Sequence, residues 1–128
     1  MIIPLANAIF DNKIDINLFL KSGKKIENLN FKKVEKKIFP IIDIKKRLNE
    51  HPSTPIIINA ANEVLVDQFL RKNIQFLSIS LVLKKILKDS NYKNNAVKHP
   101  NTIKIINEIN NWAKKRTLEK LTQFNLYV

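Results

Sequence analysis

Hydrophobic residues in the second half of the chain recur at intervals of three and four, and this spacing predicts a series of helices. The first helix follows Pro40 and ends before Pro52. The second begins at Thr54, a good N-cap residue followed by a proline, and continues to about Lys72. Asn73 is expected to take the left-handed conformation that ends this helix.

Two further helices are expected on either side of a polar segment. The third is capped near Ser78, and its hydrophobic stripe consists of Phe76, Ile79, Leu83, Ile86 and Leu87. Residues 91–98 are polar and are expected to form a loop. The last helix opens around Pro100 and continues, with weaker periodicity, to Phe124. Four helices joined by short polar links predict an antiparallel helical bundle.

The first part of the chain has a different pattern. Pro4 and its apolar neighbours predict a short helix over residues 3–10. Residues 24–37 are the least helical part, and their partial alternation of apolar and polar residues predicts a short strand or an extended link. We therefore expect a mainly α fold with two parts: residues 1–37, a short helix and an extended segment, and residues 38–128, the bundle.

The composition excludes several kinds of active site. The 128 residues include a single glycine, Gly23, and no cysteine. A phosphate-binding loop needs several glycines for tight turns and close backbone approach, so this chain cannot form one. The absence of cysteine excludes thiol nucleophiles, disulfides and thiolate metal sites. The two histidines, His51 and His99, both precede prolines and lack metal-binding spacing. The sequence therefore predicts no catalytic residues and no metal ligands.

The chain is strongly basic, with 23 Lys and Arg against 11 Asp and Glu and a formal net charge of +12. Taken alone, this charge favours a nucleic acid or an anionic membrane as partner. Only three of the 23 cations are arginines, however, and arginine is the preferred residue for reading bases and clamping phosphates. Ile, Lys and Asn, which have AT-rich codons, make up 57 of the 128 residues. We therefore attribute most of the charge to genome composition and expect neither nucleic-acid nor membrane binding.

The most unusual segment is residues 55–70 of the second predicted helix. Its polar residues fall within one arc of an otherwise apolar surface: Asn59, Asn62, Glu63 and Asp67. Ala60 and Ala61 would let a neighbouring helix approach closely. The arc either forms a polar site on a central helix or satisfies nearby backbone groups and solvent and so specifies one packing arrangement. The second interpretation is favoured.

This segment also carries a resemblance to a known family. Residues 57–64 read Ile-Ile-Asn-Ala-Ala-Asn-Glu-Val, and residues 74–79 read Ile-Gln-Phe-Leu-Ser-Ile. They resemble the C-terminal region of 1-deoxy-D-xylulose 5-phosphate reductoisomerase, which has an Asn-Ala-Ala-Asn-Glu helix followed by an Ile-x-Phe-x-x-Ile turn. Residues 1–6, and residues 29–31 with Phe39-Pro40, are similar to further segments of the family in the same order.

Two positions depart from the family's pattern, namely Ile2, where the family usually has Arg or Lys, and Ile41, where Cys is common. The resemblance implies that the chain corresponds to the last third of a longer enzyme. That enzyme has an NADPH-binding domain, a catalytic domain that holds Mg²⁺ or Mn²⁺, and a C-terminal helical bundle. Residues 1–37 would then be the end of the catalytic domain and its connection to the bundle. The family's metal and phosphate ligands lie upstream and have no counterpart here.

The resemblance supplies one candidate for cofactor binding, Met1, which matches a family methionine that packs near the nicotinamide ring. It also implies a homodimer formed through the upstream part. The expected location is the cytoplasm in a bacterium, or the plastid in a plastid-bearing host. On this hypothesis the chain alone is inactive.

Two functions from different classes remain open. In the first, the chain braces the catalytic domain of the reductoisomerase and buries Asn59, Asn62 or Glu63, the candidate interface residues, against another part of the enzyme. In the second, it is a free-standing basic helical module that binds nucleic acid or an acidic protein. A free module should leave those three residues exposed and concentrate its lysines on one face.

Overall fold

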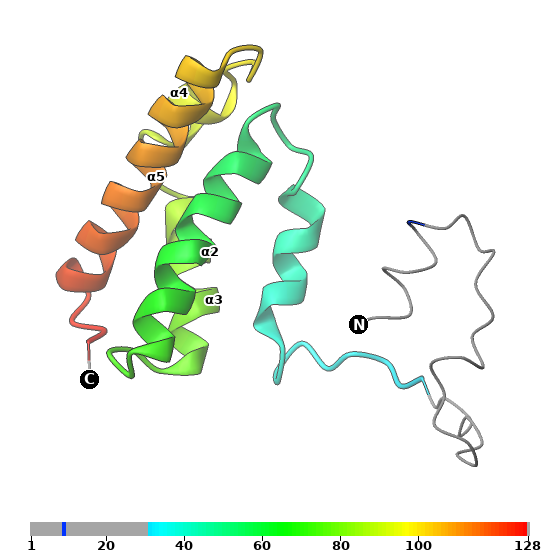
Figure 1. Ribbon diagram of the computed structural model, residues 1–128. Helices are drawn as coiled ribbons and strands as arrows, with labels where there is room; N and C mark the ends of the chain where they lie inside the picture. The colour runs from blue at the N-terminus through cyan, green and yellow to red at the C-terminus, as the bar shows by residue number, and fades with distance from the viewer. Residues whose placement is uncertain (1–8, 10–30, 128) are drawn as a thin grey trace. The chain divides into compact units, whose positions relative to one another are not determined.

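The structure is a computed structural model that describes Ile9 and residues 31–127. The chain divides into two units, Met1–Lys33 and Val34–Val128, and the elements of the fold belong to the second unit. They are η2 (Pro40–Arg47), α2 (Thr54–Leu70), α3 (Phe76–Ile86), α4 (Tyr92–Ala96) and α5 (Ile103–Gln123) (Figure 1). Apart from Ile9, the helix predicted over residues 3–10 lies outside the described residues, as does the first half of the extended segment predicted over residues 24–37. The second half, residues 31–37, contains neither helix nor strand.

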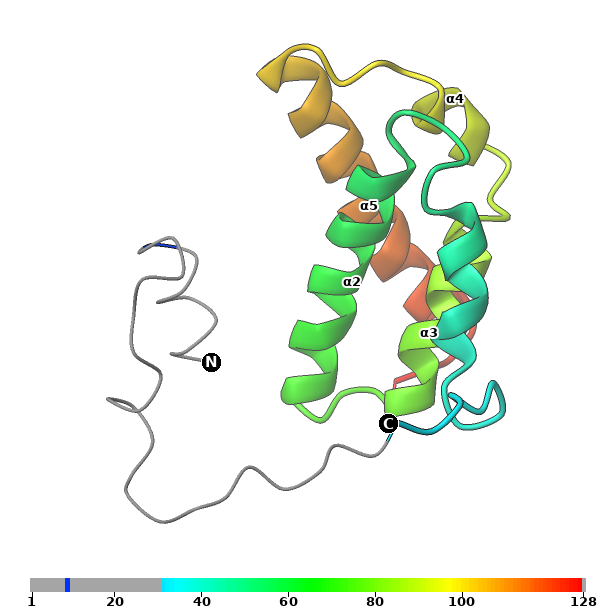
Figure 2. The same ribbon diagram turned by 90° about the vertical axis from the view of Figure 1, so that its right-hand side faces the viewer.

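The elements form the antiparallel helical bundle that the sequence predicts. η2, α2, α3 and α5 alternate in direction along the chain (Figures 1 and 2). α5 packs against both α2 and α3, and α3 also contacts η2. The mainly α fold class is therefore confirmed, and residues 31–127 contain no β-strand. In the same part of the chain, no helix is both long enough and apolar enough to cross a membrane.

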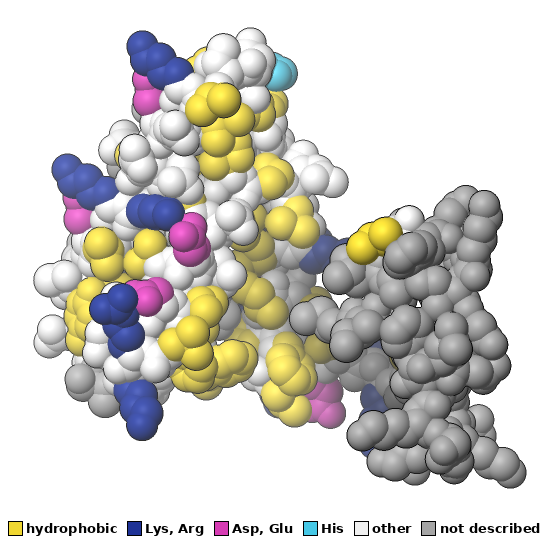
Figure 3. Space-filling model, in the orientation of Figure 1, with side chains coloured by type: hydrophobic (Ala, Val, Ile, Leu, Met, Phe, Trp, Pro, Cys, Tyr) yellow, Lys and Arg dark blue, Asp and Glu magenta, His cyan; other side chains and the backbone are white. Residues whose placement is uncertain are grey.

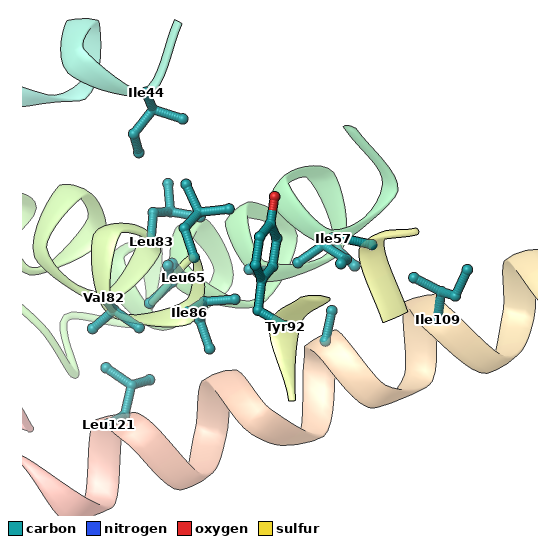
Figure 4. Close-up of a cluster of buried hydrophobic side chains, with 14 of the residues drawn as sticks. Ile44, Ile57, Leu65, Val82, Leu83, Ile86, Tyr92, Ile109 and Leu121 are labelled. Carbon is teal, nitrogen blue, oxygen red and sulfur yellow. The ribbon is translucent and has the colours of Figure 1, made fainter. Parts of the chain in front are cut away.

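The core lies between α2, α3 and α5 and consists of aliphatic side chains (Figure 4). Ile57 and Leu65 from α2, Ile86 from α3, and Ile109 and Leu121 from α5 have no exposed surface. Complete burial of one such side chain contributes about 1.5–3 kcal/mol to the free energy of unfolding. Because the chain has no disulfide, this burial is the main source of its stability.

Small residues allow α2 and α5 to approach each other closely, as the sequence predicts. Ala60 and Ala61 on α2 and Ala113 on α5 have no exposed surface. The contact between α2 and α5 is the most extensive one between helices. Thr117, one turn after Ala113, is also fully buried, and its hydroxyl donates a hydrogen bond of 2.7 Å to the Ala113 carbonyl. The contact therefore contains no unsatisfied hydroxyl.

The ends of α2 differ in detail from the prediction. The helix begins at Thr54, but the N-cap position is occupied by Ser53, whose side chain makes no capping hydrogen bond. The Thr54 hydroxyl instead lies 2.7 Å from the Tyr92 hydroxyl. At the other end, the left-handed residue is Lys72, with φ of 62°, and not Asn73. Because the C-cap is the residue before Lys72, the left-handed position falls one residue earlier than predicted.

Two predictions for the following segments are wrong. α3 begins at Phe76, not near Ser78, which lies within its first turn. Residues 91–98 contain the short helix α4 where a loop is expected. Tyr92 and Ala96 lie one turn apart on α4 and are 4% and 0% exposed. Their burial against the core, more than the helix propensity of this Asn-rich segment, stabilises α4.

A polar cluster attaches α4 to the start of α2. The Tyr92 hydroxyl bonds the Thr54 hydroxyl, and the Arg47 guanidinium lies 5.2 Å from the centre of the Tyr92 ring. The backbone N–H of Ser53 donates to the Ala96 carbonyl at 2.9 Å. Burial raises the pKa of Tyr92, so its hydroxyl stays protonated near neutral pH. These contacts explain why Ser53 and Thr54 are completely buried although both are polar.

η2 is a 3₁₀-helix of eight residues, which is long for this type of helix. Ile44 is its only buried residue and faces the core cluster (Figure 4). Polar contacts hold the rest of η2 in place. Arg47 donates to the Leu87 carbonyl at 3.0 Å, and the Lys84 ammonium donates to Asp43 at 3.0 Å. η2 is therefore attached to the bundle mainly by contacts at its surface.

A buried carboxylate joins the turn after α3 to α5. The Asp89 side chain is 1% exposed and accepts hydrogen bonds from Arg116 Nε at 2.7 Å and from the backbone N–H of Asn91 at 3.0 Å. The Lys120 ammonium lies 3.1 Å from the same carboxylate. Burial by itself raises the pKa of Asp89, but these three donors outweigh it, and the pKa is lowered.

The residues after α5 return to the turn between α2 and α3. Asn125 has φ of 50°, a left-handed conformation that reverses the chain after the helix. Tyr127 then forms an isolated antiparallel bridge with Ile74, and Leu126 packs against the core. The end of the described chain is therefore attached to the loop that precedes α3.

Candidate functional site

The polar arc predicted on α2 separates into two parts in the structure. Asn59, Asn62 and Glu63 are all exposed, so none of them is buried within the described part of the chain. The Glu63 carboxylate lies 3.0 Å from the Lys114 ammonium on α5 and so faces that helix. Asp67 pairs with Arg71, the C-cap residue of α2. Asn59 and Asn62 make no side-chain hydrogen bond with the described residues, and both line a groove.

This groove, which we call the η2–α2 groove, consists of two adjoining hollows that share Ile41 and Asn62. The larger, of about 510 Å³, lies between η2 and the first half of α2 and includes Ile58 and Asn59. The smaller, of about 230 Å³, extends to the start of α3. Its other lining residues include Phe39, Val66, Phe76, Leu77 and Ile79.

The walls of the groove are largely apolar and open to solvent. Phe76 and Leu77 are 57% and 56% exposed, and Ile41 and Val66 are 39% and 37% exposed. Figure 3 shows apolar side chains gathered between η2 and α2. Large continuous apolar surfaces of this kind are typical of binding surfaces rather than of ordinary protein exterior. The amides of Asn59 and Asn62 add donors and acceptors at its edge.

The charges beside the groove fix η2 on α3. The Asp43 carboxylate contacts the ammonium groups of Lys84 at 3.0 Å and Lys36 at 3.4 Å. The hydrogen bond from Lys84, with a smaller effect from Lys36, lowers the pKa of Asp43. Asp43 is therefore ionised at neutral pH, which keeps this wall of the groove in position.

The described residues do not assemble catalytic machinery. No group of three or more His, Asp or Glu side chains within them could hold a metal ion. His51 is half-buried beside the Tyr92 ring, and His99 is exposed. Met1, the candidate for cofactor binding, lies outside the described residues. What the structure does present is an apolar groove with two amide side chains, a surface suited to receiving protein side chains.

Sequence reasoning identifies the α2 side of this groove but not the η2 side. Asn59 and Asn62 are visible as polar residues on an apolar helix. The apolar run Phe39-Pro40-Ile41-Ile42 is the signal for the other wall, because η2 buries only Ile44 and leaves the rest of that run as an apolar surface.

The sequence matches known proteins along most of its length. Residues 1–116 match the family described as the DXP reductoisomerase C-terminal domain. The 1-deoxy-D-xylulose 5-phosphate reductoisomerase of Nautilia profundicola is 32% identical over 76 residues, which cover 59% of this chain and 21% of that protein. The enzyme of the same name from Campylobacter fetus is 39% identical over 51 residues, covering 40% of this chain and 14% of the relative.

A third relative with this name, from Campylobacter jejuni subsp. doylei, is 34% identical over 76 residues, covering 59% of this chain and 21% of its own length. The aligned region thus spans about a fifth or less of the curated relatives. No solved structure matches the chain significantly. The family match covers far more than half of the residues. The chain therefore belongs to the DXP reductoisomerase C-terminal domain family.

Proposed function

We propose that this chain is the C-terminal structural part of a 1-deoxy-D-xylulose 5-phosphate reductoisomerase. That enzyme converts 1-deoxy-D-xylulose 5-phosphate to 2-C-methyl-D-erythritol 4-phosphate with NADPH and a divalent metal, and in a bacterium it acts in the cytoplasm. The family match over residues 1–116 and the names of the relatives support this assignment. Residues 38–128 are the bundle domain in this proposal, and residues 1–37 are the end of the catalytic domain and the segment that connects it to the bundle.

The role proposed for the bundle is to brace the catalytic part of the enzyme through the η2–α2 groove. The observation that carries this proposal is the exposed apolar lining of the groove, with Asn59 and Asn62 at its edge. Phe39 and Pro40 line the groove at the start of η2, so the polypeptide enters the bundle beside it. Upstream protein is therefore the natural occupant, and it would bury the two asparagines that are exposed in this chain.

The metal and NADPH are assigned to upstream residues. The part of the chain seen in the structure brings together no set of side chains that fits a divalent metal. The single glycine, Gly23, excludes a glycine-rich nucleotide loop. In this proposal these residues contribute by positioning the domain that carries the chemistry.

The alternative function, a free basic module for nucleic acid or an acidic protein, predicts that Asn59, Asn62 and Glu63 are exposed, as they are in the described part of the chain, and that the lysines are concentrated on one face. The exposed lysines occur instead on several elements, including Lys45 on η2, Lys93 on α4, and Lys104 and Lys115 on α5. We expect only weak binding to duplex DNA. A nanomolar affinity that falls steeply with salt concentration would favour the alternative.

Two measurements test the proposal. Purified 1–128 should not oxidise NADPH in the presence of the sugar phosphate and Mn²⁺, and measurable turnover would contradict it. The gene should continue in frame upstream of codon 1 and encode a glycine-rich nucleotide motif. If the frame is closed there, this chain is not part of a longer reductoisomerase.

Substitutions in the groove then test the bracing role in the full-length protein. Ile41→Ser should lower its melting temperature and turnover, because Ile41 lines both hollows of the groove. The matched control is Ile103→Ser, which changes an isoleucine that is 77% exposed at the start of α5. In 1–128 alone, Ile41→Ser should lower the melting temperature by less than it does in the full-length protein. Equal losses in the two proteins would show that nothing upstream occupies the groove.

A further inference from the structure

A second groove lies beside α3. It adjoins the η2–α2 groove, with which it shares Pro40, Leu77 and Ser80, but it has a different chemistry. This α3 groove, of about 430 Å³, is lined by four lysines: Lys37, Lys84, Lys85 and Lys88. Pro40, Leu77 and Leu81 supply apolar surface, and no acidic residue lines it. A volume of this size lies within the range of small-molecule sites.

The residues of the α3 groove are ordered along the helix. Leu77, Leu81, Lys84 and Lys88 are separated by four, three and four residues, which places them along one stripe of α3 and its continuation. This stripe is about 16 Å long, given a rise of about 1.5 Å per residue. Its first half is apolar, and both leucines are substantially exposed, at 56% and 42%. Its second half is cationic.

The lysines that line the groove differ in their partners. Lys84 is paired with Asp43, whereas Lys37 and Lys88 make no ion pair with the described residues. The Lys85 ammonium lies 2.7 Å from the centre of the Phe124 ring, and Lys120 lies 5.9 Å from the same ring. Burial, together with repulsion from Lys120, lowers the pKa of Lys85. An anion bound in the groove near Lys85 would favour the charged form of that side chain.

We propose that the α3 groove binds an elongated organic anion, a carboxylate or phosphate ester that also carries an apolar chain. Leu77 and Leu81 contact the apolar chain, and Lys84 and Lys88 hold the anionic group. A ligand with only one of these properties would leave half of the stripe without a partner. This inference goes beyond the bracing role and is tested separately from it; Leu77 lines both grooves, so the ligand and a segment seated in the η2–α2 groove would share this side chain.

The probe for this site is decyl phosphate below its micelle concentration, titrated into ¹⁵N-labelled 1–128 and followed by NMR. Chemical shift changes should concentrate on residues 77–88. Inorganic phosphate and decanol, which represent the two halves of the probe, should each bind more weakly. Scattered shift changes, or decanol binding as tightly as decyl phosphate, would overturn the proposal.

Three variants separate the site from general charge attraction. Lys84→Gln/Lys88→Gln should weaken binding roughly tenfold, because it removes two cations from the site. Lys93→Gln/Lys104→Gln makes the same change in net charge elsewhere and should leave the affinity nearly unchanged. Asp43→Asn should strengthen binding, because it frees Lys84 from its partner. If the two double variants lose affinity equally, there is no site on α3.

Two comparisons test whether the natural ligand of the α3 groove is an acidic protein segment or a membrane surface instead of a small molecule. A short glutamate–leucine peptide that binds residues 77–88 more tightly than decyl phosphate would assign the surface to an acidic protein segment instead. Binding to vesicles of phosphatidylglycerol without binding to monomeric decyl phosphate would assign it to a membrane surface. Either result would overturn the small-ligand proposal.

Discussion

Replacing Asp89 by asparagine tests whether its buried carboxylate links α3 to α5. Asparagine has nearly the same shape, so the substitution leaves no cavity. Its oxygen keeps the hydrogen bond from the backbone N–H of Asn91, which measures 3.0 Å in the native protein. Its amide group, however, places N–H donors where the native carboxylate accepts from Arg116 and Lys120, at 2.7 and 3.1 Å.

The expected loss of unfolding free energy depends on the contacts that the substitution removes and on those that Arg116 and Lys120 keep. A hydrogen bond to a charged group contributes about 1.5–3 kcal/mol, and removing one partner of a buried ion pair costs about 3–5 kcal/mol. Arg116 retains a second contact with Glu119 at 2.7 Å, and its side chain is 30% exposed. Lys120 is 13% exposed. Because both cations keep some solvation, we expect the lower end of the range, about 3 kcal/mol.

Urea denaturation of 1–128, followed by far-UV circular dichroism, measures this loss. For a domain of this size, each kcal/mol lowers the melting temperature by about 4–8 °C. The matched control is Asp67→Asn, which breaks the pair between Asp67 and Arg71, 2.9 Å apart, whose side chains are 50% and 68% exposed. That pair should contribute about 0.5 kcal/mol or less. If both substitutions lower the free energy of unfolding equally, the contacts of the Asp89 carboxylate do not stabilise the fold.

Three further predictions follow from features of the fold. The pKa of Asp89 is lowered from its ordinary value of 3.8, so its stabilising effect is present above about pH 4 and is lost as the pH falls through the lower folded value. The difference in unfolding free energy between the native protein and Asp89→Asn should therefore stay constant from pH 7 to 5 and shrink in stronger acid; a difference unchanged at pH 2 would contradict this. Tyr92→Phe leaves the buried Thr54 hydroxyl without its partner and should cost about 1–2 kcal/mol in urea denaturation, whereas Tyr127→Phe, at a residue 44% exposed, should cost almost nothing. Lys72→Gly should raise stability by about 0.5–1 kcal/mol, because glycine adopts the positive φ of this position without a steric penalty; a lower melting temperature would count against it.

The sequence predicts the helices well where periodicity and proline agree. α2 is the clearest case, because Pro55 follows its first residue and because Ala60 and Ala61 lie on the face that is completely buried. Its end is predicted less well. The left-handed residue is Lys72 and not Asn73 because the helix ends one residue earlier than expected. The composition of this segment does not specify where the helix ends.

α4 and the groove could not be predicted for a different reason. Residues 91–98 are polar, and the helix there depends on contacts that Tyr92 makes with Thr54 and Arg47, which lie far away in the sequence. The η2–α2 groove likewise combines residues from three separate segments. The sequence shows Asn59 and Asn62 as polar residues on an apolar helix, but whether they lie at the edge of an open hollow depends on where η2 packs.

The return of the chain after α5 has a practical consequence for where this domain ends. The family match stops at residue 116, yet the next residue, Thr117, and Leu121 are completely buried, and Tyr127 bridges to Ile74. The packed helical unit thus extends beyond the residues that match the family model. A protein trimmed at residue 116, or a chimera that transplants only the shared region into a relative, would lose part of its core. Such work should therefore retain residues 117–127.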